Sequence, residues 1–181
     1  MYLFPKRWRF RLLTVSKRKY PKSKLFRLRL LTLVNEKEKR IEKKAFNWEL
    51  VDSIGDTTRL SDYRNDVIIL DFWATWCGPC RKAMPVINTW MESDNLDGVH
   101  VFSVNIWEQT PEEAVNIMEE NEYAMTLVFG NDGVADQYEI ESIPYICAVD
   151  GNGIIRFEET GYSQGLSEIL TWWVEDLKKK K

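Results

Sequence analysis

The chain has 181 residues, of which 44% are apolar and 29% are charged, so it can bury the core of one ordinary domain and is not disordered throughout. Its three cysteines are too few for a disulfide-stapled scaffold. Its one histidine, His100, excludes a metal site built from several histidines and argues against a Ser-His or Cys-His triad.

The net charge of −3 hides a strong asymmetry along the chain. Residues 1–44 contain 16 Lys and Arg against 3 Asp and Glu, a net charge of +13. Residues 45–181 contain the other 9 basic residues and 25 acidic ones, a net charge of −16. We therefore divide the chain into a basic N-terminal arm, residues 1–44, and an acidic domain, residues 45–181.

The acidic domain starts with patterns typical of strands. Between Phe46 and Leu60 apolar and polar residues alternate around a turn-forming segment, which predicts a hairpin. Residues 67–73 form an almost unbroken apolar run, typical of a strand buried on both faces of a helix-covered sheet. A helical apolar stripe follows from Ala83 to Met91, with Pro85 inside it.

Strands and helices alternate through the rest of the domain. A second buried strand is predicted at residues 99–106, and a helix then starts at Pro111, with Thr110 and Glu113 as a capping box. An apolar segment, a brief helix, two strands joined by a turn and an amphipathic closing helix follow at residues 125–129, 134–138, 143–149, 154–157 and 166–177. This order predicts an α/β sandwich.

Two cysteines in a Cys-x-x-Cys spacing follow the first buried strand. Cys77 stands where a helix begins, so free backbone N–H groups and the positive end of the helix dipole would stabilise its thiolate. Two intervening residues place Cys80 within disulfide reach, one turn further along. We predict that Cys77 attacks a disulfide in a partner and that Cys80 resolves the mixed disulfide.

Two structural interpretations compete with this redox site. A zinc ion needs four ligands, and outside the pair only Cys147 and His100 remain as good donors, in no paired spacing. A merely structural thiol pair would not explain why the motif opens a helix directly after an apolar strand. We therefore expect no metal and no cofactor. Cys147 is expected to be a small buried apolar residue, and His100 is given no role.

Residues 76–80, Trp-Cys-Gly-Pro-Cys, resemble the active-site motif of the thioredoxin superfamily. Residues 60–76 before the helix, residues 81–85 after the motif, and Ile143-Pro144 with residues 150–153 look like the TlpA/ResA-like thiol-disulfide oxidoreductases within it. The resemblance covers about residues 45–177. It implies a thioredoxin-like α/β fold, in which helices flank a central mixed sheet, with an N-terminal β-hairpin and a central insertion around residues 107–130.

The resemblance also implies a substrate-binding surface. Ile143-Pro144 matches the superfamily's cis-proline, which lies opposite the cysteine pair and leaves the Ile143 backbone free to pair with a substrate strand. A proline that opens a strand is consistent with such a geometry, and a trans proline at a strand edge is the alternative. Trp76, Gly78 and Pro79 of the motif complete the predicted surface.

Two acidic residues are candidates for catalytic roles beside Cys77 and Cys80. Asp71 is an acid in an otherwise apolar strand, so burial should raise its pKa and let it exchange protons near neutral pH. Its place six residues before Cys77 matches the buried acid of thioredoxin, although TlpA-like proteins vary there. Glu108 falls where ResA-like members carry a glutamate beside the cleft. A solvated carboxylate is the alternative for each.

The basic arm allows several interpretations. We expect it to be helical or partly disordered, and a helix over residues 25–44 and a strand are equally compatible with its pattern. It is either a segment left from a longer architecture or a surface that contacts anionic lipid through aromatic residues interleaved with Lys and Arg. Nucleic-acid binding is not expected. Its longest uncharged runs are shorter than the core of about 7–15 apolar residues of a signal peptide.

The predicted function is a thiol-disulfide oxidoreductase that reduces protein disulfides. The alternatives are a peroxiredoxin-like thiol peroxidase, whose Pro-x-x-x-Thr-x-x-Cys loop is not found before Cys77, and a non-catalytic docking module. Expected partners are disulfide-containing proteins and an upstream dithiol electron donor, and we expect a monomer. By resemblance the protein belongs in the periplasm or cell envelope, with the cytoplasm as the alternative because no signal peptide is evident.

Overall fold

A computed structural model describes residues 41–93 and 96–179 of the chain. The chain divides into two units at Arg40 and Ile41, and the described residues belong to the second, Ile41–Lys181. The folded domain thus begins at Ile41, four residues before the boundary expected from charge, because Lys43–Lys44 form a strand of the sheet, β1. The expected alternatives for the arm up to residue 40 lie outside the described residues.

The described elements follow the predicted order. After β1 they are β2 (Glu49–Asp52), β3 (Thr57–Arg59), the 3₁₀ turn η1 (Leu60–Tyr63), β4 (Val67–Trp73), α3 (Cys80–Ser93), β5 (Val99–Asn105), α4 (Pro111–Glu120), β6 (Thr126–Phe129), α5 (Asp132–Gln137), β7 (Tyr145–Val149), β8 (Ile154–Thr160) and α6 (Leu166–Lys178). The N-terminal hairpin is β2 and β3, and the central insertion supplies α4 and β6.

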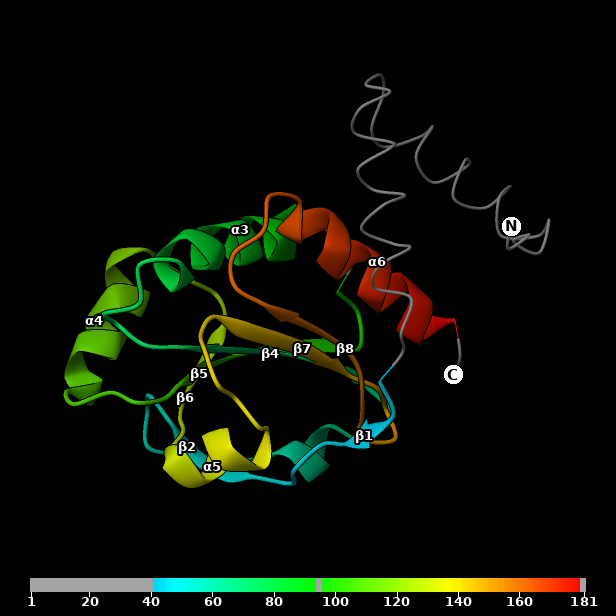
Figure 1. The fold of residues 1–181 in the computed structure, drawn as a ribbon, viewed down its shortest axis with the longest axis horizontal. Coiled ribbons are helices and arrows are strands. Elements are labelled where there is room, and N and C mark those ends of the chain that lie inside the picture. The colour runs from blue at the N-terminus through cyan, green and yellow to red at the C-terminus, as the bar shows by residue number, and fades with distance from the viewer. Residues whose placement is uncertain (1–40, 94–95, 180–181) are drawn as a thin grey trace, which may run out of the picture. The chain divides into compact units, whose positions relative to one another are not determined.

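The strands of the described residues form one mixed sheet in the order β1-β8-β7-β4-β5-β6-β2-β3. The three strands β4, β5 and β6 are parallel, and the others pair antiparallel with their neighbours. Helices α3, α4 and α6 lie on one face of the sheet, and α5 lies on the other, where the segment between β1 and β2 also crosses (Figure 1). This is the predicted thioredoxin-like α/β fold with helices on both faces.

Strand β4 separates two apolar layers. Ile69 and Trp73 point into the layer under α3 and α6, whereas Ile68, Leu70 and Phe72 point into the layer on the α5 side. All seven residues of β4 are buried, as the unbroken apolar run predicted. Because side chains alternate along a strand, Asp71 faces the same layer as Trp73, the layer that also contains both cysteines of the motif.

The start of α4 differs in one respect from the prediction. Pro111 is the first helical residue, but the Thr110 side chain caps no backbone N–H, so the predicted capping box does not form. The carboxylate of Glu113 instead accepts a long hydrogen bond from the Thr75 hydroxyl, at 3.5 Å. The Glu113 carboxylate thus makes a tertiary hydrogen bond in place of the predicted local bond at the start of the helix.

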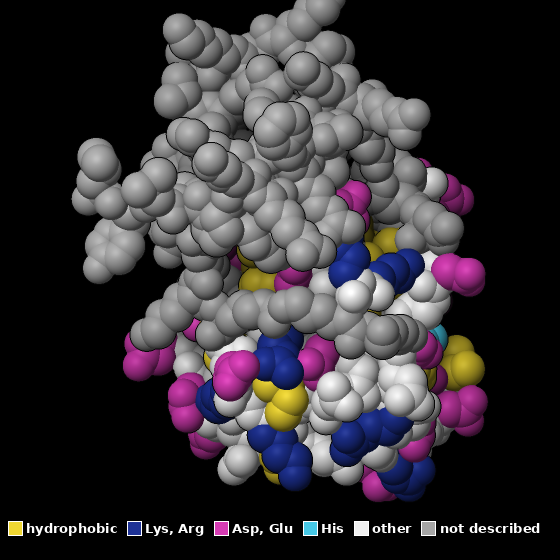
Figure 2. All heavy atoms as spheres, turned by 90° about the vertical axis from the view of Figure 1, so that its right-hand side faces the viewer, with side chains coloured by type: hydrophobic (Ala, Val, Ile, Leu, Met, Phe, Trp, Pro, Cys, Tyr) yellow, Lys and Arg dark blue, Asp and Glu magenta, His cyan; other side chains and the backbone are white. Residues whose placement is uncertain are grey.

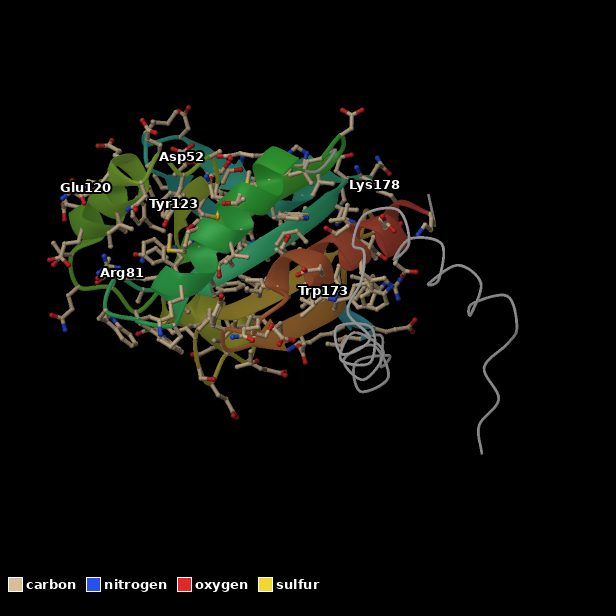
Figure 3. The ribbon with its side chains drawn as sticks, turned by 90° about the horizontal axis from the view of Figure 1, so that it is seen from above. Asp52, Arg81, Glu120, Tyr123, Trp173 and Lys178 are labelled. Atoms are coloured by element: carbon tan, nitrogen blue, oxygen red, sulfur yellow. A yellow bond between two sulfur atoms is a disulfide. The ribbon has the colours of Figure 1, made fainter. Side chains whose placement is uncertain are left out.

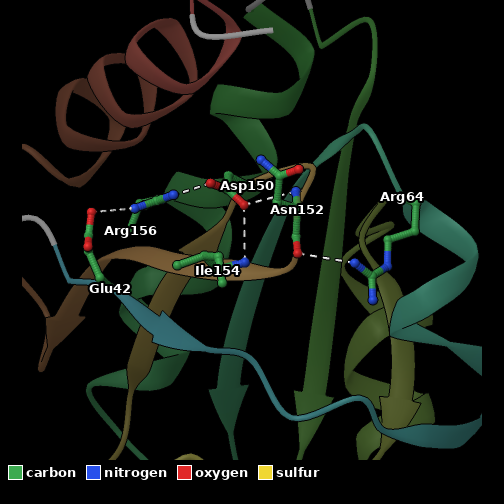
Figure 4. A network of polar contacts seen from close by, with 6 residues as sticks. All are labelled: Glu42, Arg64, Asp150, Asn152, Ile154 and Arg156. Atoms are coloured by element: carbon green, nitrogen blue, oxygen red, sulfur yellow. Dashed lines mark hydrogen bonds and ion pairs between the residues drawn. The ribbon is translucent and has the colours of Figure 1, made fainter.

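A polar network lies at the end of the sheet opposite to the cysteine motif (Figure 4). One Asp150 oxygen accepts the backbone N–H groups of Asn152 and Ile154, and the other accepts Arg156 Nε at 2.7 Å. Arg156 also pairs with Glu42, just before β1. The end that carries β1 faces the viewer in Figure 2, where the described surface shows basic and acidic side chains side by side.

Candidate redox site

The cysteine motif lies where β4 passes into α3. The Cys77 N–H donates to the carbonyl of Ala74, and the Cys77 carbonyl accepts the Arg81 N–H at 3.1 Å, the first bond of the helical ladder. Cys77 Sγ accepts the N–H of Cys80 at 3.2 Å. The sulfur therefore takes the position of a helix cap, where an unpaired backbone N–H points at it and stabilises negative charge.

Cys77 and Cys80 form a disulfide, with their Cα atoms 5.3 Å apart. Cys77 is 4% exposed, whereas Cys80 is completely buried. This asymmetry fits an outer sulfur that a partner reaches first and an inner one that acts afterwards. Among residues 41–93 and 96–179, no three His, Cys, Asp or Glu side chains are grouped so as to hold a metal ion.

The peptide bond between Ile143 and Pro144 is cis, as the resemblance implied. Pairing between β4 and β7 ends at Phe72 and Tyr145, so Pro144 comes next to the point where β4 leads into the motif. The Pro144 carbonyl accepts the Gly161 N–H at 2.8 Å, which ties it to the end of β8. Pro144 is buried and Ile143 is partly buried.

Gly78 and Pro79 of the motif are exposed, and so are the basic side chains of Arg81 and Lys82 in the first turn of α3. Figure 3 shows Arg81 at the same end of the molecule as Tyr123, which follows α4. Positive charge at the start of this helix adds to the electrostatic stabilisation of a Cys77 thiolate.

Asp71 is completely buried, and neither carboxylate oxygen has a hydrogen-bond partner. Burial raises the pKa of Asp71 from its ordinary value of 3.8 to about 7. Its neighbours in the sheet register are Ser103 on β5 and Ile146 on β7, neither of which is charged. An unpaired carboxyl in this apolar layer can therefore gain or lose a proton near neutral pH.

Glu108 is held close to the motif. Its Oε2 accepts the backbone N–H of Thr75 at 2.7 Å and lies 3.4 Å from Asn105 Nδ2, while Oε1 accepts the Gln109 N–H at 3.2 Å. Thr75 precedes Cys77 by two residues. The structure thus brings Glu108 to the loop that leads into the motif, across the 33 residues that separate it from Thr75.

Three residues at this place were not expected from the sequence: Thr75, Asn105 and Glu113. A hydroxyl beside a Trp-Cys motif and a buried amide at a strand end carry no distinctive sequence signal. Asn105 is a polar residue in the run 99–106, but His100 and Ser103 also break the apolar pattern of this run, so the break does not single it out.

Cys147 and His100 lie outside this constellation. Cys147 is a free, buried thiol in the apolar layer on the α5 side, across the sheet from Cys80, and burial raises the pKa of its thiol. The His100 ring lies 3.0 Å from Asp66 and packs on Tyr63. Cys147 is thus the small buried apolar residue that the sequence predicted.

Comparison with known proteins defines the class. The model of the AhpC/TSA family matches residues 41–158, about two thirds of the chain, and the chain belongs to this family. It is 33% identical over 120 residues to the thiol-disulfide oxidoreductase ResA of Geobacillus kaustophilus, an alignment that covers 65% of this chain and 67% of the relative. ResA of Bacillus subtilis is 30% identical over 119 residues, 65% of each chain.

Solved structures show the same fold. The crystal structure of a putative thiol:disulfide interchange protein DsbE from Chlorobium tepidum superposes with a TM-score of 0.69 at 27% identity, covering 76% of this chain and 96% of that one. StoA from Bacillus subtilis superposes with a TM-score of 0.62, covering 71% of this chain and 96% of that one. With its Cys77–Cys80 disulfide, the chain is a ResA-like thiol-disulfide oxidoreductase that acts on disulfide-containing substrates.

Proposed function

We propose that this protein works in the reducing direction and cleaves disulfides of protein substrates through a mixed disulfide on Cys77. The observation that carries the proposal is the asymmetry of the pair. Cys77 Sγ accepts a helix N–H and its residue keeps 4% exposure, whereas Cys80 is completely buried. A substrate sulfur can approach the first and not the second.

The electron balance follows from two exchanges. In the reduced protein the Cys77 thiolate attacks one sulfur of a substrate disulfide, which forms the mixed disulfide and releases one substrate thiolate. The Cys80 thiolate then attacks Cys77 Sγ, releases the second substrate thiolate and leaves the Cys77–Cys80 disulfide. The substrate gains two electrons, and an upstream dithiol donor must return them to the protein by the reverse exchange.

Asp71 would supply the proton transfer that the second exchange needs. A thiol buried as deeply as Cys80 must lose its proton before it attacks, and a carboxylate in the same apolar layer can accept it. Support comes from the complete burial of Asp71, its lack of hydrogen-bond partners and its pKa of about 7. Glu108 joins the catalytic site because its carboxylate holds the Thr75 N–H next to the motif.

The substrate would bind along Trp76, Gly78 and Pro79 on one side and Ile143 with Pro144 on the other. Trp76 is 62% exposed, an unusual exposure for the largest apolar side chain. Pairing of β7 with its neighbours begins only at Tyr145, which leaves the preceding Ile143 backbone for an extended substrate segment.

We place the protein in the cell envelope, as the resemblance to TlpA/ResA-like proteins implies, and we expect it to be a monomer. None of the described helices is long and apolar enough to cross a bilayer. The arm, residues 1–44 with a net charge of +13, would contact anionic lipid. Co-sedimentation with anionic liposomes, with and without residues 1–40, tests this role, and equal, salt-insensitive binding of both forms would exclude it.

Reduction of insulin by dithiothreitol, followed by turbidity, tests the proposed function. The wild-type protein should accelerate precipitation, and Cys77→Ser should abolish the acceleration. A different result would identify a peroxidase: the wild type does not reduce insulin but oxidises thiols in the presence of peroxide, and Cys77→Ser loses this oxidation. Activity in neither assay would leave a docking module and refute the proposal.

A further inference from the structure

Asn105 is a buried amide at the point where three strands end beside the redox motif. It is the last residue of β5, only 2% of it is exposed, and it pairs in register with Trp73, the last residue of β4. Its carbonyl accepts the Gly130 N–H at 2.8 Å, directly after β6. The backbone of Asn105 is thus fixed by the strands on either side of β5, β4 and β6.

The side chain of Asn105 connects β4 to Glu108. Its Nδ2 lies 3.5 Å from the Trp73 carbonyl and 3.4 Å from Glu108 Oε2. Both partners can only accept hydrogen bonds, and a side-chain amide nitrogen carries two hydrogens, so one Nδ2 can serve both. The two acceptors also decide the orientation of the amide, because the flipped Oδ1 would face two oxygens.

We propose that Asn105 is a positioning residue for the redox reaction. It holds the carboxylate of Glu108 on the Thr75 N–H, and through this bond it sets the loop that presents Cys77. The inference rests on the proposed role of the Cys77 thiolate. The amide also partly neutralises the carboxylate's charge, which in the absence of this donor would disfavour a nearby thiolate.

Loss of the amide should therefore affect Cys77 itself. In Asn105→Ala we expect the pH midpoint of Cys77 alkylation by iodoacetamide to rise by about half a unit. The rate of attack on a substrate disulfide should fall about tenfold because the loop is no longer held in place. The alkylation assay uses the reduced protein alone and needs no substrate, so its outcome is separate from that of the insulin assay.

A double-mutant cycle distinguishes positioning from a merely structural role. If Asn105 acts through Glu108, Asn105→Ala should shift the alkylation midpoint in the wild-type background and leave it unchanged in a Glu108→Gln background. Equal shifts in both backgrounds, or no shift in either, would overturn the proposal. Asn88→Ala is the matched control, since this second buried asparagine binds the Ala124 N–H away from the motif and its loss should leave the midpoint unchanged.

A second measurement avoids any change at Asn105. The side-chain amide protons of Asn105, observed by NMR, should shift when Glu108 is replaced by Gln, because a charged acceptor deshields them more than a neutral one. Those of Asn88 should not shift. Unchanged Asn105 signals would show that the Nδ2 contact with Glu108 does not exist in solution.

Discussion

The indole Nε1 of Trp76 donates a hydrogen bond to the carbonyl oxygen of Trp107 at 3.2 Å. Trp107 has a φ of 55°, in the left-handed region that disfavours a large side chain. The bond ties the residue before Cys77 to the loop after β5. An exposed aromatic ring is thereby held in one orientation beside the disulfide.

The orientation of Trp76 predicts a role in binding protein substrates. In Trp76→Ala the KM for a protein disulfide should rise roughly threefold to tenfold, because a preorganised aromatic contact is lost. Reaction with a small disulfide, which cannot span the surface, should change little. Ile54→Ala in the β2–β3 hairpin, where the side chain is 81% exposed, is the control. Equal losses for both substrates would argue for damage to the motif itself.

Cys80→Ser should trap the mixed disulfide. Cys77 can still attack, but the resolving sulfur is missing, so a covalent complex with the substrate accumulates and is seen by mass spectrometry. Cys147→Ser should still turn over, since its thiol lies across the sheet from Cys80. Rapid turnover by Cys80→Ser would mean that another thiol resolves the intermediate.

Asp71 predicts an unusual dependence of stability on pH. Its pKa is raised from 3.8 in the unfolded chain to about 7 in the native protein, so the native state binds the extra proton between these values. The contribution of protonated Asp71 to the free energy of unfolding is fully present below about pH 4. It is lost as the pH rises through about 7, where Asp71 ionises in the native protein as well. The free energy of unfolding of the oxidised protein should fall by about 4 kcal/mol at most across this window on account of Asp71.

Denaturant unfolding of Asp71→Asn provides the comparison. The neutral isostere removes the titration, so the variant should be more stable than the wild type at pH 8 and should show less loss between pH 5 and pH 8. Using the disulfide form keeps the two cysteines from titrating. The same pH profile in both proteins would place the Asp71 carboxyl in a solvated environment.

The Asp150 network should contribute to stability and not to activity. Asp150→Ala leaves two backbone N–H groups and Arg156 Nε without their acceptor, which should lower the free energy of unfolding by about 2 kcal/mol. Glu42→Gln should change it little, because Glu42 is 77% exposed at its side chain. Insulin reduction should be retained in both, and its loss in Asp150→Ala would reveal coupling between the two ends of the sheet.

Most elements of the fold could be predicted because their signals are local. The run 67–73 has no polar residue except Asp71, and the only place for such a strand is the middle of a covered sheet. The start of the domain could not be placed in the same way. Lys43–Lys44 look like part of a basic arm, and only their pairing with Ile154 and Ile155 makes them a strand.

Residues 67–80 contain the cysteine pair, the helix start at which it lies and the acid within the preceding strand. The sequence by itself therefore determined the redox chemistry. The surroundings of Cys77 were decided by tertiary structure. Parallel pairing of β4 with β5 brings Asn105 opposite Trp73, and the turn after β5 then aims Glu108 at Thr75. Such contacts join residues about thirty positions apart, and strand register, which no local pattern encodes, sets them.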